Sequence, residues 1–239
     1  MASNGISRRA MVACACCGAA AGALSGPWHA RAASTDGHAG TKLSPDEALR
    51  LLKEGNARYI TDAPFRGVEG RERRIEIARG QQPFAVLVGC SDSRVPPELL
   101  FGRGLGELFI IRVAGNTVDR AALGSIEYAV AELGVPLVLV LGHERCGAVA
   151  AAVSVVEKNT IFPGAIGEMV EPIVPAVLRA MSKGGDLLDQ AVRENVRGVA
   201  VRLRQEGPIL AGAIAAKRLR IVGARYDLDD GAVDFFDEA

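Results

Sequence analysis

Four apolar runs, each about the length of one strand, are the feature of this sequence that most restricts its fold. The runs are "FAVLVGC" (84–90), "ELFIIRVAG" (107–115), "PLVLVLGH" (136–143) and "RLRIVGARYDL" (218–228). Such runs are typical of strands that are covered on both faces of a parallel sheet. Helical patterns separate them, so the sequence predicts a single α/β domain with a mainly parallel central sheet flanked by helices.

The predicted helices surround these runs. Residues 44–60 begin with Ser44 as N-cap, Pro45 at the first helical position and Glu47 three residues after the cap, which together form a capping box. This amphipathic helix lies outside the strand-forming part of the chain and is predicted to be an N-terminal helical arm. Further helices are predicted at 71–79, 120–134, 146–156, 166–181 and 185–205, and an edge strand at 231–236.

Length and composition suit one soluble domain. The chain has 239 residues, of which 49% are apolar and 23% charged, which is ordinary for a globular protein. The formal net charge of +0 argues against a nucleic-acid partner bound by bulk positive charge. We expect no membrane span after the N-terminal segment.

Residues 1–32 have the features of an export signal. Arg8 and Arg9 precede a stretch of small and apolar residues without acids, and Ala30-Arg31-Ala32 resembles an A-x-A cleavage site. The paired arginines resemble a twin-arginine signal. We therefore expect a periplasmic or otherwise exported protein; if this segment is no signal and stays attached, the protein is cytoplasmic.

The remaining chain divides into a flexible segment at 33–43 and a domain at 44–239. Beyond residue 32 only two cysteines remain, Cys90 and Cys146. Histidine is equally scarce there, with His38 in the glycine-rich segment and His143 at the end of a predicted strand. Few residues could therefore form a transition-metal site.

The candidate ligands follow two predicted strands. Cys90 ends the first apolar run, and His143 ends the third, three residues before Cys146. Ligands in such sheets gather outside the carboxyl ends of the strands, and two thiolates with an imidazole are a three-ligand set for zinc. A Cys90–Cys146 disulfide is the alternative in an exported protein.

The motifs "CSDSR" and "GHxxCGA", some fifty residues apart, resemble those of the β-class carbonic anhydrases, zinc enzymes that interconvert carbon dioxide and bicarbonate. The resemblance extends from residue 44 to about residue 228. It implies one Zn²⁺ per chain bound by Cys90, His143 and Cys146, and a catalytic dyad of Asp92 and Arg94. It also implies a homodimer or a higher even oligomer.

The same resemblance implies a substrate pocket. Gln81 matches a glutamine that helps to hold substrate, and Gly147 lies where a backbone group approaches it. Phe109 and Tyr128 match aromatic positions that line the pocket across a subunit interface. For Gly115, the sequence leaves a purely geometric role and a substrate contact equally open.

The chemistry can also be built from the residue types. Zinc lowers the pKa of a bound water to about 7 and so supplies hydroxide near neutral pH. Asp92 can accept a hydrogen bond from that hydroxide while Arg94 holds its carboxylate off the metal. An ordinary surface ion pair is the alternative for these two residues, and a released Asp92 could take the fourth zinc position.

Two other classes of protein share these features. One is a related zinc hydrolase acting on another small substrate, such as carbon disulfide; the other is a non-catalytic zinc or bicarbonate sensor. The resemblance also suggests a non-allosteric subclass, because Leu87 and Ala114 replace a tryptophan and a valine that shape a regulatory bicarbonate pocket in some members.

Overall fold

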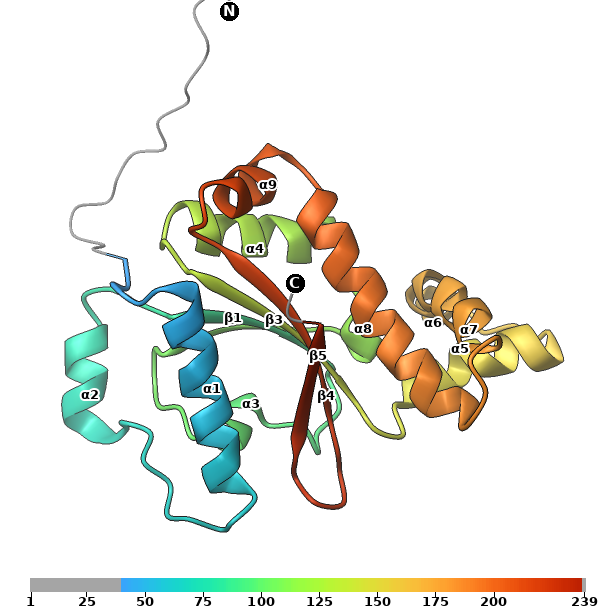
Figure 1. Ribbon diagram of the computed structural model, residues 1–239, viewed down its shortest axis with the longest axis horizontal. Coiled ribbons are helices and arrows are strands. Elements are labelled where there is room, and N and C mark those ends of the chain that lie inside the picture. Colours follow the sequence, from blue (N-terminus) through green and yellow to red (C-terminus); the bar gives the residue numbers. More distant parts are fainter. Residues whose placement is uncertain (1–39, 238–239) are drawn as a thin grey trace, which may run out of the picture. The chain divides into compact units, whose positions relative to one another are not determined.

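The computed structural model describes residues 40–237 of the chain (Figure 1). The predicted export signal at 1–32 and most of the segment at 33–43 lie outside the described residues. Within them, no helix is both long and apolar enough to span a membrane.

The described residues contain one five-stranded sheet in the order β2-β1-β3-β4-β5. The strands are β1 (Ala85–Gly89), β2 (Leu108–Arg112), β3 (Leu137–His143), β4 (Arg220–Tyr226) and β5 (Val233–Asp237). β2, β1, β3 and β4 are parallel, and β5 pairs antiparallel with β4 as an edge strand. The predicted α/β fold with a mainly parallel sheet is confirmed.

Helices flank this sheet. They are α1 (Pro45–Tyr59), α2 (Gly70–Ile77), α3 (Pro97–Leu100), α4 (Arg120–Ala131), α5 (Gly147–Lys158), α6 (Ala165–Val170), α7 (Val174–Ala180), α8 (Leu187–Gln205) and α9 (Pro208–Ala215), with 3₁₀ turns η1 (Ala114–Asn116) and η2 (Glu171–Ile173).

One prediction about a helix is wrong, and one helix was missed. The single helix expected at 166–181 is divided into α6 and α7 by η2, where Pro172 has no N–H to continue the helical hydrogen bonds. Helix α9 was not predicted, because "PILAGAIA" is apolar almost throughout and lacks the polar side that marks an amphipathic helix.

Alternate residues of each strand build two cores. Val86 and Val88 of β1 face the core formed with α4, α8 and α9, whereas Ala85 and Leu87 face the core formed with α1 and α3. Figure 1 shows α1 on one side of the sheet and α4 and α8 on the other. Because both faces are covered, all five residues of β1 are buried, as its apolar run predicts.

Helix α1 is capped as predicted. Ser44 accepts from the backbone N–H of Glu47, whose carboxylate accepts from the N–H of Ser44 at 2.8 Å. Its apolar side, with Leu49 and Leu52, is buried against the sheet of its own chain. The described chain thus gives this helix a core role, and its role as an N-terminal helical arm stays a prediction.

The order of the strands determines where a site can form. From β1 the chain passes to β2 on one side and then crosses to β3 on the other side. The carboxyl ends of β1 and β3 therefore form a topological switch point, the place where ligands bind in open α/β sheets.

Candidate metal centre

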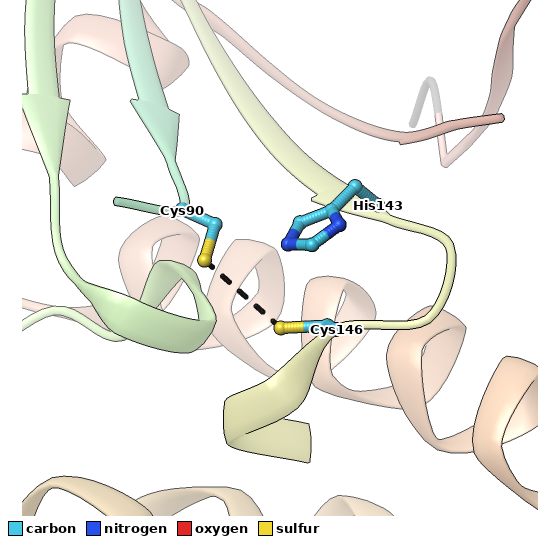
Figure 2. A group of neighbouring side chains, drawn as sticks. All are labelled: Cys90, His143 and Cys146. Carbon is cyan, nitrogen blue, oxygen red and sulfur yellow. Dashed lines mark hydrogen bonds between the residues drawn. The ribbon is translucent and has the colours of Figure 1, made fainter. Parts of the chain in front are cut away.

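Cys90, His143 and Cys146 meet at this switch point. Cys90 directly follows β1, His143 is the last residue of β3, and Cys146 is the N-cap of α5. Their ligand atoms all lie within 4.8 Å of one another. Figure 2 shows both sulfurs and one ring nitrogen turned toward the same space. The sequence prediction that these three residues converge is confirmed.

The two thiols are free and not joined in a disulfide. Their sulfurs are 4.0 Å apart. Two sulfurs held at about 2.3 Å from a tetrahedral zinc would be roughly 3.8 Å apart. The observed spacing therefore fits a metal placed between them.

The imidazole of His143 is oriented for a metal. Its Nδ1 lies 2.9 Å from the carbonyl oxygen of Glu144, which accepts a hydrogen bond from the Nδ1–H. Its Nε2 is buried and has no hydrogen-bond partner among the described residues. A buried ring nitrogen without a partner is costly unless it binds something, and a backbone acceptor for the other nitrogen is the usual arrangement of a metal-binding histidine. The donor set thus fits zinc.

The electrostatics of the pair favour one thiolate before any metal binds. The pKa of Cys90 is lowered to about 4, mainly by its hydrogen bond with the thiol of Cys146, with further help from the N–H of Gly115. The same proton, together with burial, raises the pKa of Cys146. A metal ion that displaced this shared proton would leave two thiolates as ligands.

Asp92 and Arg94 form a bidentate ion pair beside the three ligands. Nε and Nη2 of Arg94 donate to the two carboxylate oxygens at 2.9 and 2.7 Å, and the backbone N–H of Arg94 donates at 2.9 Å. These bonds hold the pKa of Asp92 well below its usual range. Oδ2 of Asp92 also lies 3.8 Å from Nε2 of His143. An ionised carboxylate therefore borders the metal position while Arg94 restrains it.

Two further residues stabilise the segment that carries Cys90 and Asp92. Arg112 donates to the carbonyl oxygen of Cys90 at 2.7 Å and to that of Asp92. Gly115 donates its N–H to the sulfur of Cys90 at 3.2 Å. Arg112 was not predicted from the sequence, although its place at the end of the strand beside β1 could have indicated it. For Gly115, the structure shows a backbone contact with a ligand.

The predicted substrate-binding residues are not gathered around these ligands in one chain. Gln81 precedes β1 and is exposed, so the strand's length of roughly 16 Å separates it from Cys90. Phe109 pairs with Val86, well before the end of β1, and Tyr128 is half exposed on α4. Only Gly147, the residue after Cys146, lies beside the ligand group. The roles of all four stay predictions.

Fold and site together define an α/β protein with a candidate Cys-His-Cys metal centre at the strand ends. Comparison with known proteins narrows this class. The carbonic anhydrase family profile matches residues 85–233. The chain therefore belongs to the carbonic anhydrase family, and its similarity to solved structures places it in the β class.

Similar proteins include the carbonic anhydrase of Mycolicibacterium smegmatis, 40% identical over 191 residues, which covers 80% of this chain and 93% of that protein. Carbonic anhydrase 2 of Mycobacterium tuberculosis is 41% identical over 188 residues, covering 79% and 91%. A tetrameric β-carbonic anhydrase of Sordaria macrospora has a TM-score of 0.63 at 27% identity, covering 68% of this chain and 84% of that one.

Proposed function

We propose that this enzyme catalyses the reversible hydration of carbon dioxide with one Zn²⁺ held by Cys90, His143 and Cys146. One observation carries the proposal: the buried Nε2 of His143, which has no hydrogen-bond partner in the described part of the chain, faces two free thiols at a spacing that suits tetrahedral zinc. Zinc bound there would supply the Lewis acidity that makes hydroxide available near neutral pH.

The dyad would orient the reaction. With its carboxylate held by Arg94, Asp92 is a pure hydrogen-bond acceptor at neutral pH and cannot donate. It can therefore accept a hydrogen bond from the attacking hydroxide and so direct one of the oxygen lone pairs toward carbon dioxide. Arg94 keeps this carboxylate ionised and restrains both of its oxygens beside the metal position.

Two variants test the dyad. Arg94→Ala and Asp92→Asn should both retain zinc and lose carbon dioxide hydration in stopped-flow assays. Arg50→Ala is the matched control, because the side chain of Arg50 is about as exposed as that of Arg94 and pairs with Glu54 on α1. Turnover near that of the control in either dyad variant would show that the roles assigned to Asp92 and Arg94 are wrong.

A homodimer or a higher even oligomer is part of the proposal. β2 is an edge strand whose apolar residues, including Phe109, are only partly buried within one chain, and such an edge favours pairing with another strand. A partner would also explain why Gln81 and Tyr128 lie away from their own chain's ligands. Light scattering should give a mass of two chains or an even multiple.

Export and regulation complete the proposal. Residues 1–32 would direct the enzyme to the periplasm, as their paired arginines suggest.

In the described chain, Asp92 is paired with Arg94, and Leu87 is fully buried in the core formed with α1. We expect this pairing to persist near neutral pH, without a regulatory switch.

A further inference from the structure

A buried asparagine lies on the apolar side of α8. Ala191, Val192 and Val196 form that side, and Asn195, which is only 4% exposed, lies among them. Its Nδ2 donates to the carbonyl oxygen of Gly115 at 2.8 Å. A buried amide costs free energy unless it is hydrogen-bonded, so this bond is a specific feature of the packing.

Gly115 connects this bond to the metal centre. The peptide on its N-terminal side donates N–H to the sulfur of Cys90 at 3.2 Å, and the peptide on its C-terminal side accepts from Asn195. Gly115 has φ 69° and ψ 21°, in the left-handed region. The hydrogen bond from Asn195 fixes the peptide plane that follows Gly115. This restricts the peptide plane before Gly115, whose N–H points toward the sulfur of Cys90.

The position of α8 is set beside the same site. A Cβ on Gly142, the residue before His143, would lie 2.6 Å from Cγ2 of Val196 and 3.0 Å from Cγ1 of Val192. The helix thus packs closely against the end of β3 because residue 142 has no side chain. This contact places Asn195, between the two valines, against the loop of Gly115.

We infer that Asn195 is a positioning residue that acts through Gly115 on the sulfur of Cys90. An N–H donated to a thiolate withdraws charge from sulfur, and groups that support a ligand in this way tune the bound metal. Without the hydrogen bond from Asn195 to Gly115, the N–H of Gly115 would hold the sulfur of Cys90 less firmly. The sulfur would then keep more negative charge, and its position as a ligand would be less well fixed. This inference rests on the metal site of the proposed function.

The test compares two buried asparagines. Asn195→Leu removes the anchor, whereas Asn56→Leu removes an equally buried amide that bonds Gly231 and Val233, away from the metal ligands. Both variants are prepared with zinc for competition against a chelator, and with cobalt(II) in place of zinc for absorption spectroscopy. Asn195→Ala serves in the same assays if the leucine variant does not fold.

The inference predicts that Asn195→Leu raises the zinc dissociation constant roughly 10- to 100-fold. It also predicts a shift of the sulfur-to-cobalt charge-transfer band to longer wavelength, because sulfur becomes a stronger donor. Asn56→Leu should lower stability and change neither readout. An unshifted band in the Asn195 variants, or an equal shift in Asn56→Leu, would overturn the inference. Absent carbon dioxide hydration would overturn the proposed function alone, since neither metal readout depends on turnover.

Discussion

Replacing Gly115 with alanine should destabilise the enzyme through two separable effects. An alanine at φ 69° would occupy the left-handed region, at a cost of about 1–2 kcal/mol. Its Cβ would also lie 2.6 Å from Cδ1 of Ile173 and 3.1 Å from Cβ of Ala148, and such overpacking costs about 1–3 kcal/mol. We expect the free energy of unfolding to fall by about 2–5 kcal/mol in total.

Urea denaturation of the zinc-loaded protein measures this loss, and a second substitution separates its parts. Valine lacks Cδ1, so in an Ile173→Val background the Gly115→Ala change should cost less than in the wild-type protein: the backbone strain of about 1–2 kcal/mol and the smaller cost of the remaining contact with Cβ of Ala148. Gly212→Ala in α9 is the control, because its Cβ would meet no atom of the described residues within 4 Å and alanine favours a helix by up to about 1 kcal/mol. A Gly115→Ala variant as stable as wild type would refute this reasoning.

Three further predictions concern ionisation, regulation and export. In the metal-free protein, thiolate absorbance at 240 nm should show one thiolate lost as the pH falls through about 4, because the lowered pKa of Cys90 keeps it ionised above that value; a midpoint near that of an ordinary thiol would contradict this. Loss of hydration activity at low pH should follow a single-proton titration, because Leu87 leaves no tryptophan to form a regulatory bicarbonate pocket; a Hill slope near two, steepened by bicarbonate, would be the contrary result. A reporter fused to residues 1–33 should reach the periplasm, and the double change Arg8→Lys, Arg9→Lys should keep it in the cytoplasm. Cytoplasmic retention of the unaltered fusion would rule out the signal.

Sequence reasoning could predict the three ligands because of a geometric property of parallel sheets. Cys90 and His143 each end an apolar run, and the carboxyl ends of parallel strands meet at one edge. Cys146, three residues after His143, is brought to the same place by the short turn into α5. The motifs therefore predict the ligand group without any knowledge of strand order.

The residues that support the ligands could not be predicted in the same way. Asn195 lies 80 residues from Gly115, and only the docking of α8 on Gly142 brings them together. A polar residue on an apolar helix side was the one sequence signal available for it. Arg112 likewise acts through the register of β2 against β1, which pairs it with Gly89, and register depends on packing rather than on local sequence.

Zinc reconstitution tests the central claim most directly. The metal-free enzyme is titrated with zinc, and carbon dioxide hydration is followed by stopped flow at each step alongside the bound metal. If Cys90, His143 and Cys146 form one catalytic centre per chain, activity should rise linearly and stop rising at about one zinc per chain. The Cys146→Ser variant should bind zinc weakly and gain little activity. Hydration by the metal-free protein, or full zinc binding without hydration, would contradict the account.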